Sequence, residues 1–371
     1  MSLIYYNGYN IFINQKYQEN LKLLPGGESF SGYFKIFSPN ISAVDRTNTL
    51  KFPLKVDLLP FLVMPELVEF NKSFSDICDE RALFLMHKVK NTGRKLAVMY
   101  SGGVDSTTLL CSLLKNCSKK DLKDNVVVLL SNGSIYENKN FFYDHVIKYF
   151  NCVSSFKFPY YLGNDDYLFV SGENADQLFG SQVVSDFVRI YPFSDLLKNI
   201  NTIEDKLINL IKIRLKSDDI TAKKWYEKLK QITDAAPIDI DNGYKMLWWV
   251  NFTTKWQSVY VRMLSYSQNK DTIKLEENYT TFFSTKDFQL WSMNNSDKLI
   301  KDTTSSSKYI AKEYIYEYNG DSSYLSKPKI GSLSRLMRQK HIPMTIDGDM
   351  NYSYDFPLAE HYNYNNSFVD F

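Results

Sequence analysis

Two adjacent glycines between a buried strand and a helix constrain this chain more than any other feature. Residues 95–100 (KLAVMY) form an apolar run that predicts a buried strand, and residues 107–115 carry the apolar spacing of a helix. Residues 101–106 (SGGVDS) stand between them. Glycines let the backbone turn tightly and approach a ligand closely. The sequence therefore predicts a strand, a glycine turn and a helix, with a ligand at the start of the helix.

The start of that helix has the chemistry of an anion site. Its N–H groups and the positive end of the helix dipole favour a phosphate, and Ser101 and Ser106 add hydroxyl donors. Asp105 suits such a site when it holds a cation that bridges to the phosphates. A Walker A loop would end in Gly-Lys-Ser/Thr, but this loop has no lysine. The spacing of its glycines also does not match GxGxxG. The structural alternative is an ordinary Ser/Gly turn after a strand.

The SGGVDS loop resembles the pyrophosphate loop of the ATP pyrophosphatase (PP-loop) superfamily. This resemblance implies cleavage of ATP between the α and β phosphates and adenylation of a substrate. A second buried strand, predicted at residues 167–170, runs into residues 171–180 (SGENADQLFG). That segment is similar to SGExADELFGG of asparagine synthetases and their relatives, the β-lactam synthetases and lasso-peptide cyclases. The chain departs from the pattern at Gln177, where the family has Glu, and at Ser181, where it has a second glycine.

Alternating strand and helix patterns over residues 76–190 predict an α/β fold with a parallel sheet. Further strands are expected at 126–130 and 153–158, and helices at 74–90 and 140–150. Residues 191–332 read as mainly helical, with Trp248, Trp249 and Trp256 predicted as core. The resemblance covers residues 76–332 as a synthetase domain: a PP-loop core (HUP-like, adenine nucleotide α-hydrolase) over 76–190, then the helical part over 191–332. Residues 1–75 are expected to form a small β-rich region, and residues 333–371 a C-terminal tail.

The resemblance also assigns site residues. ATP and pyrophosphate binding is expected at Ser101, Gly102, Gly103, Asp105, Ser106, Ser131, Gly172 and Glu173. Asp105 and Asp176 follow two predicted strands and are expected to hold Mg²⁺. Lys329 falls on the family's catalytic lysine, with Lys327 in place of an arginine. Glu277 is the second catalytic candidate, and its neighbour Glu276 remains open because the register there is uncertain by one residue.

Composition narrows the class of protein. With 371 residues and 44% hydrophobic content, the chain can bury a core and is expected to hold two domains or more. The net charge of +2 is too small to predict electrostatic attraction to nucleic acid or to a membrane surface. The cysteines form no CxxC pair and indicate a reducing cytoplasm without structural zinc: Cys78, Cys111, Cys117 and Cys152. No signal peptide is expected at residues 1–16.

The expected function is an ATP-dependent, AMP-forming ligase. A small-molecule or peptide carboxylate would attack the α-phosphorus, and ammonia or an amine would then attack the acyl-adenylate. Relatives that use glutamine expose a cysteine at position 2, whereas this chain has Ser2 and a short N-terminal region, so no glutaminase is expected. No nucleic acid or membrane partner is expected, and a homodimer is left open. The alternatives are a PP-loop enzyme that modifies tRNA or a nucleobase, and a non-catalytic ATP-binding protein.

Overall fold

The computed structural model describes residues 44–50, 62–264, 277–301 and 308–326, and these form two compact units. The sheet unit comprises the described residues of 72–173, 266–282 and 309–371. The helical unit comprises those of 1–71, 174–265 and 283–308. Because the chain leaves the sheet unit after Glu173 and re-enters it before β5, each unit is built from separate stretches of sequence.

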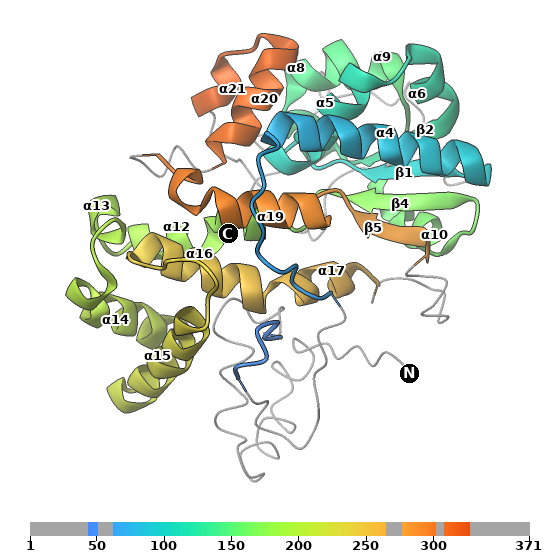
Figure 1. The fold of residues 1–371 in the computed structure, drawn as a ribbon. Coiled ribbons are helices and arrows are strands. Elements are labelled where there is room, and N and C mark those ends of the chain that lie inside the picture. Colours follow the sequence, from blue (N-terminus) through green and yellow to red (C-terminus); the bar gives the residue numbers. More distant parts are fainter. Residues whose placement is uncertain (1–43, 51–61, 265–276, 302–307, 327–371) are drawn as a thin grey trace. The chain divides into compact units, whose positions relative to one another are not determined.

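The sheet unit contains a five-stranded parallel sheet in the order β3-β2-β1-β4-β5 (Figure 1). The strands are β1 (Lys95–Met99), β2 (Val126–Leu130), β3 (Asn151–Ser154), β4 (Tyr167–Ser171) and β5 (Tyr279–Thr281). Val98 pairs with Val128 on one side and with Val170 on the other. The central strands are apolar runs rather than alternating ones, because helices cover both faces of a parallel sheet.

Helices of the sheet unit connect the strands and pack on them. They are α4 (Phe74–Thr92), α5 (Val104–Asn116), α6 (Lys119–Asn125), α7 (Asn132–Glu137), α8 (Lys139–Phe141), α9 (Ile147–Tyr149), α10 (Phe158–Gly163), α20 (Tyr309–Asn319) and α21 (Ser323–Ser326). A π-helical turn, η1 (Phe142–Val146), joins α8 to α9, and a 3₁₀ turn, η2 (Ser155–Lys157), follows β3. Helix α4 begins at a capping box in which Ser73 and Asp76 satisfy each other's backbone N–H groups.

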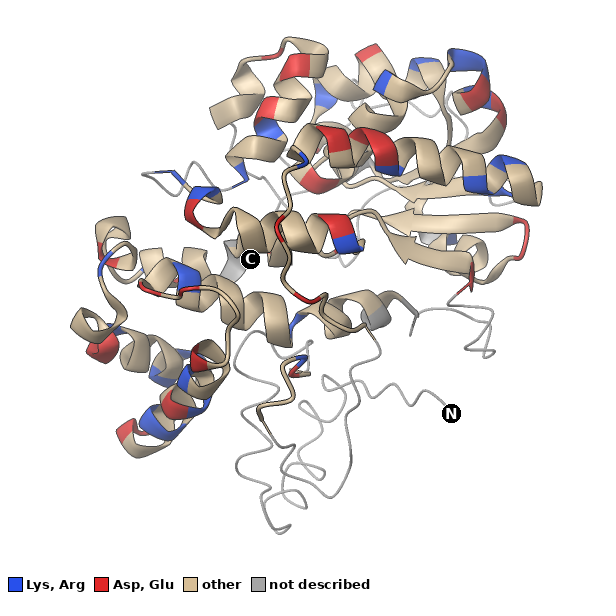
Figure 2. Ribbon diagram, viewed as in Figure 1, with Lys and Arg blue, Asp and Glu red and all other residues tan. Residues whose placement is uncertain are grey.

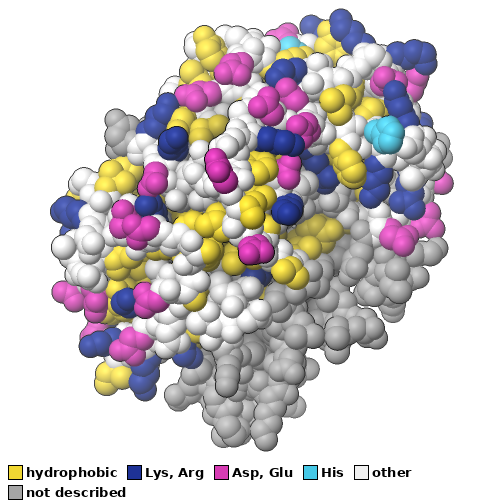
Figure 3. All heavy atoms as spheres, in the orientation of Figure 1, with side chains coloured by type: hydrophobic (Ala, Val, Ile, Leu, Met, Phe, Trp, Pro, Cys, Tyr) yellow, Lys and Arg dark blue, Asp and Glu magenta, His cyan; other side chains and the backbone are white. Residues whose placement is uncertain are grey.

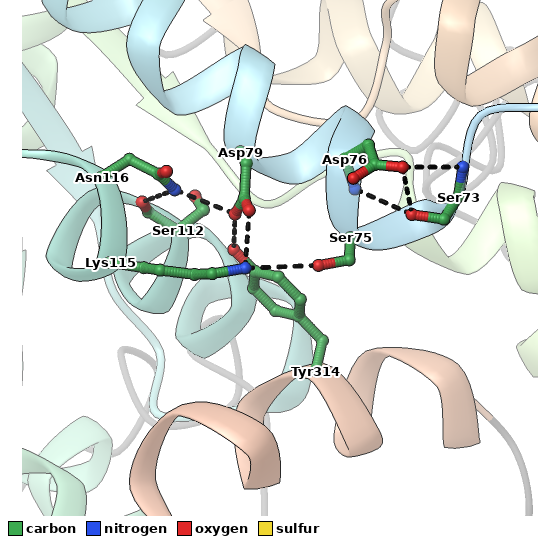
Figure 4. A network of polar contacts seen from close by, with 8 residues as sticks. All are labelled: Ser73, Ser75, Asp76, Asp79, Ser112, Lys115, Asn116 and Tyr314. Atoms are coloured by element: carbon green, nitrogen blue, oxygen red, sulfur yellow. Dashed lines mark hydrogen bonds and ion pairs between the residues drawn. The ribbon is translucent and has the colours of Figure 1, made fainter.

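A polar network ties α20 to α4 and α5 (Figure 4). The Asp79 carboxylate accepts hydrogen bonds from Lys115 Nζ at 2.6 Å, Asn116 Nδ2 at 2.9 Å and the Tyr314 hydroxyl at 2.6 Å. Burial raises the pKa of Tyr314 well above its ordinary value, and the charge of Asp79 adds to the effect. The phenol therefore remains a donor, and it fixes α20 on the two helices.

The helical unit has no strand among its described residues. Its helices are α11 (Ala175–Phe179), α12 (Ser181–Val188), α13 (Phe193–Leu196), α14 (Glu204–Leu215), α15 (Asp219–Asp234), α16 (Gly243–Thr254), α17 (Trp256–Leu264) and α19 (Lys286–Asn294), with 3₁₀ turns η3 (Ile200–Thr202) and η4 (Ser296–Lys298). Trp248, Trp249 and Trp256 are fully buried, so their prediction as core is confirmed. The indole N–H groups of Trp248 and Trp249 donate to Leu178 O and Ile232 O.

Arg46 attaches residues 44–50 to this core. Its guanidinium donates to Gln289 Oε1 and to Phe252 O, each at 2.8 Å. It also lies over the rings of Phe252 and Trp256, 5.0 and 4.6 Å from their centroids. Burial lowers the pKa of Arg46 to about 9. A buried cation is costly without partners, and here two ring faces, Gln289 Oε1 and Phe252 O stabilise the guanidinium.

The predicted α/β class with a parallel sheet is confirmed, and so are the strands expected at 95–100, 126–130 and 167–170. The strand expected at 153–158 is only partly right. Strand β3 ends at Ser154, and Pro159 lies in the first turn of α10, where its fixed φ favours a helix start. Most of the predicted β-rich region (1–75) and all of the predicted tail (333–371) lie outside the described residues.

Charges are distributed without a dominant sign. Both signs of charge occur on the helices of each unit (Figure 2), and the face in Figure 3 shows the two signs interspersed with hydrophobic side chains. Across the described ranges, no helix combines the length and the apolar character needed to cross a membrane.

Candidate functional site

The turn after β1 requires glycine at position 102. Gly102 has φ = +75°, and a Cβ there would lie 2.3 Å from Ser134 O and 2.7 Å from Glu137 Cβ. A side chain is therefore excluded both by backbone conformation and by space. Gly103 is the N-cap of α5 and offers no side-chain cap. The first turn of α5 thus begins at the carboxyl edge of the sheet without a side-chain cap on its N–H groups.

The two predicted hydroxyl donors, Ser101 and Ser106, form hydrogen bonds within this turn. Ser106 Oγ accepts from the main-chain N–H of Ser101 and lies 3.1 Å from Ser101 Oγ. It also donates to Gly103 O at 3.2 Å. Ser101 and Ser106 therefore hold the shape of the loop. A ligand phosphate would exchange these internal contacts for contacts with its own oxygens.

The second motif lies against the first. Strand β4 is the neighbour of β1, and a Cβ at Gly172 would lie 3.1 Å from both the Asp105 carbonyl carbon and Ser106 N. Glu173 follows, half-buried, and its N–H donates to Ser171 Oγ at 3.4 Å. Two glycine-containing loops, about 70 residues apart in sequence, are thus in van der Waals contact at one edge of the sheet.

The topology marks this edge as a ligand position. The chain builds β1, β2 and β3 outward in one direction, and then returns to place β4 on the other side of β1. In open α/β sheets, ligands bind at the carboxyl ends of the strands where the order reverses. Here the reversal falls between β1 and β4, which are the strands that lead into the two motifs.

Ser131 lies at the end of β2, next to the loop. It is buried and caps α7, accepting from Ser134 N at 3.2 Å while Ser134 Oγ accepts from Ser131 N at 3.2 Å. Its hydroxyl is engaged in the capping box, so its proposed contact with a nucleotide would require rearrangement. The same short helix carries a residue that sequence reasoning missed: Glu137 is buried against Gly102.

Tyr324 is a second residue that the sequence did not reveal. Its side chain is buried in α21, and burial raises its pKa above the ordinary value, with the charges of Asp105 and Glu137 adding to the effect. These three residues are thus close enough to interact electrostatically. No local pattern links Tyr324 to a loop more than 200 residues earlier in the chain, so only the tertiary structure brings them together.

Of the two catalytic candidates, only Glu277 is among the described residues, and it does not lie at this edge. Glu277 is exposed and lies two residues before β5, at the amino end of a strand parallel to β4. Its main-chain carbonyl accepts from Arg94, the residue before β1. Glu277 therefore lies at the sheet edge opposite the loop. Lys329, together with Lys327 and Glu276, lies outside the described residues.

Asp176 belongs to the helical unit and is held by a cation from the chain itself. Lys308 Nζ lies 2.6 Å from Asp176 Oδ1, and Asn251 Nδ2 donates to Asp176 O at 3.0 Å. Asp105 belongs to the sheet unit, so the expected joint Mg²⁺ site stays a prediction. Among the described residues, no three His, Cys, Asp or Glu side chains gather as a metal site.

A pocket of about 400 Å³ lies in the helical unit. Its wall is polar and comes from η3, the end of α15, residues 235–241 and α16, and includes Asn199, Lys230, Asp234, Asp241 and Met246. None of the predicted site residues lines it. We therefore assign the candidate site to the edge of the sheet at β1 and β4, on the chemistry and topology of the two loops.

Comparisons of the chain with family models, with curated proteins and with solved structures gave no match.

Proposed function

We propose that this protein is an ATP-dependent carbon–nitrogen ligase that forms AMP and pyrophosphate. The observation that carries the proposal is the contact between the SGGVDS and SGEN loops, with a Cβ position at Gly172 only 3.1 Å from Ser106 N. Each loop follows a central strand, and each resembles a segment of the PP-loop and asparagine-synthetase families. Their meeting at the reversal point of the sheet is what a nucleotide site built from both motifs requires.

The loop supplies binding groups for the phosphates. The N–H groups in the first turn of α5 and the positive end of its dipole stabilise phosphate charge. Glycines at 102 and 172 let the loop backbone pack closely on α7 and on the first turn of α5, which fixes the position of these N–H groups. Such preorganised donors stabilise charge as it develops on the departing pyrophosphate.

The donor set at this edge fits Mg²⁺. Asp105 is a half-buried carboxylate in the first turn of α5, and Mg²⁺ in proteins is bound by one or two carboxylates together with phosphate oxygens. When bound, the ion supplies positive charge to the triphosphate. Asp105 would orient it, and the resemblance gives Asp176 the same role.

The reaction consists of two displacements. A carboxylate oxygen of the substrate attacks the α-phosphorus of ATP, and the bond to the β-phosphate oxygen breaks with release of pyrophosphate. An amine or ammonia then attacks the acyl carbon, loses a proton and expels AMP, leaving an amide. Holding the reactants in place supplies several kcal/mol of the barrier reduction. Lys329 keeps the role that the resemblance implies, which is to stabilise charge during these steps.

ATP–pyrophosphate exchange tests the proposal directly. The protein is incubated with labelled pyrophosphate, Mg·ATP and a panel of carboxylic acids and peptides, and AMP is measured in parallel. We expect carboxylate-dependent exchange that is abolished by Asp105→Asn and Asp176→Asn. The matched control is Asp124→Asn, which changes an exposed aspartate on α6.

Other outcomes would identify the alternatives. ATP binding without exchange or AMP for any acceptor would indicate a non-catalytic ATP-binding protein. AMP formation that requires tRNA or a nucleobase would indicate a modifying PP-loop enzyme. Exchange at the wild-type rate in Asp105→Asn would remove the metal role from this residue.

A further inference from the structure

The start of α11 is fixed at several points by other parts of the helical unit. Asn174 adopts φ = +72°, which is uncommon for a non-glycine residue, and its Nδ2 donates to Trp256 O at 3.0 Å. Asn251 Nδ2 donates to the main-chain carbonyl of Asp176 at 3.0 Å. Two side-chain amides therefore hold the backbone that carries the Asp176 carboxylate: Asn174, just before α11, and Asn251 on α16. They limit how far the carboxylate can move.

Lys308 holds the carboxylate itself. Its Nζ lies 2.6 Å from Asp176 Oδ1, the distance of a short charge-assisted hydrogen bond. The lysine side chain is 10% exposed, whereas the Asp176 side chain is 46% exposed. The ammonium is thus buried beneath a carboxylate that remains accessible from outside. A buried ammonium is costly without a partner, so burial of Lys308 favours its ion pair with Asp176.

The backbone at Lys308 is also unusual. Its φ is +58°, in the left-handed region that non-glycine residues rarely occupy. Such conformations persist only where the surrounding structure fixes them, and they cluster at functional sites. Lys308 is the last residue assigned to the helical unit, and the next residue opens α20.

We propose that Lys308 is a positioning residue for Asp176 and keeps this carboxylate oriented for a nucleotide-bound metal ion. The inference rests on the proposed function, and it adds a role for a lysine outside the two motifs. Partners that orient a metal-binding carboxylate act without touching the metal, and their loss typically reduces metal affinity or activity by about 10–100-fold. Lys308 fits this role because its charge lies on one oxygen of the carboxylate, while the side chain of Asp176 remains half-exposed.

The first test is the affinity for Mg·ATP, measured by calorimetry on the full chain. Lys308→Met keeps the length of the side chain and removes its charge, and we expect binding about 10–100-fold weaker. Lys308→Arg keeps the charge and should bind closer to wild type than Lys308→Met does. Lys308→Gln is measured alongside, so that the comparison holds even if the methionine variant does not fold.

Lys312→Met is the matched control. Lys312 is as buried as Lys308, at 8% exposure for each residue, but its Nζ donates to the main-chain carbonyl of Leu325. We expect this variant to bind Mg·ATP as wild type does. A loss equal to that of Lys308→Met would mean that burying a lysine in this stretch is what matters, and it would overturn the proposal.

A double-mutant cycle with Asp176→Asn separates positioning from direct contact. If Lys308 acts through Asp176, Lys308→Met should cause no further loss of affinity once Asp176 is Asn. A full further loss would mean that Lys308 contacts the nucleotide itself, and equal affinity of wild type and Lys308→Met would mean that it has no role. Either result overturns the positioning proposal alone. A wild-type protein that does not bind Mg·ATP overturns the proposed function and, with it, this inference.

Discussion

The loop edge of the sheet unit and the aromatic core of the helical unit are both tightly packed, but they are packed in opposite ways. At the edge, close contact is achieved by leaving side chains out, with glycines at 102 and 172 and no side-chain cap on α5. In the core, large side chains fill the space, and the indole N–H groups of Trp248 and Trp249 are bonded to main-chain carbonyls. These two indole groups are bonded within the core, whereas α5 begins at an N-cap that receives no side-chain cap. The comparison teaches that tight packing alone does not distinguish scaffold from site. What differs is the material that makes the contact, which is glycine backbone at the edge and large aromatic side chains in the core.

The largest expected effect comes from placing a side chain in the loop edge. Gly102→Ala forces a strained φ and a Cβ within 2.3 Å of Ser134 O. We expect a loss of about 3 kcal/mol in the free energy of unfolding, combining left-handed strain with overpacking, and a loss of Mg·ATP binding. Gly93→Ala is the control, since its φ is also positive but no atom lies within 4 Å of the added Cβ. Equal losses for the two variants would show that strain, and not crowding, accounts for the glycine.

The second effect tests the buried cation of the helical unit. Arg46→Met keeps the volume but leaves Gln289 Oε1 and Phe252 O without this donor, and it removes two cation–π contacts. We expect a loss of about 2 kcal/mol in chemical denaturation, with faster hydrogen exchange in α16. The control Arg189→Met removes an exposed ion pair with Asp186, which should change stability by less than about 1 kcal/mol. A smaller loss for Arg46→Met than for the control would contradict this account of the core.

The third effect concerns the network in Figure 4. Tyr314→Phe removes the hydroxyl that donates to Asp79 at 2.6 Å and leaves the ring in place against Phe74. We expect a loss of about 1 kcal/mol, the net value of one such bond. Thermal unfolding of Tyr316→Phe, which changes a more exposed tyrosine on the same helix, gives the baseline. No difference between the two variants would show that Lys115 and Asn116 alone hold Asp79.

The smallest effect is a dependence on pH. His145 lies between the rings of Phe141 and Tyr318, and burial lowers its pKa below 6.5, although Asp144 opposes the shift. The unfolded chain therefore takes up this proton first as the pH falls. Stability from this residue is present above about pH 6.5 and is lost as the pH falls through the lowered pKa of the folded state. Denaturation curves from pH 7.5 to 5 should show a smaller decline for His145→Phe than for wild type.

Local sequence patterns predicted the central strands and the position of both motifs. Residues 126–130 are five consecutive apolar residues, and the structure places β2 on the same five. These predictions succeed because burial on both faces of a parallel strand leaves an uninterrupted apolar run. Strand β5 was not predicted, because Tyr279–Thr281 is only three residues long and carries no such run.

The contacts made by the candidate site could not be predicted in the same way. Lys308 meets Asp176, and the charge of Asp105 acts on Tyr324, across more than a hundred residues of chain. Neither lysine nor tyrosine stands in a pattern that names its partner, because such pairs depend on how distant helices pack. The same holds for Arg46, whose acceptors Phe252 O and Gln289 Oε1 lie 206 and 243 residues away.

The position of β5 has a consequence for how the chain is synthesised. Ser171 at the end of β4 and Tyr279 at the start of β5 share a contact between their hydroxyls, although they are 108 residues apart. At a typical elongation rate of about 5–20 residues per second, the ribosome needs roughly 5–20 s to produce that interval. Any four-stranded sheet that forms in this time has β4, an apolar strand, at its open edge, and such an edge is a template for pairing with other chains. Arg81, which donates to Thr280 Oγ1 and Thr281 O, can secure the fifth strand only once that strand has been made.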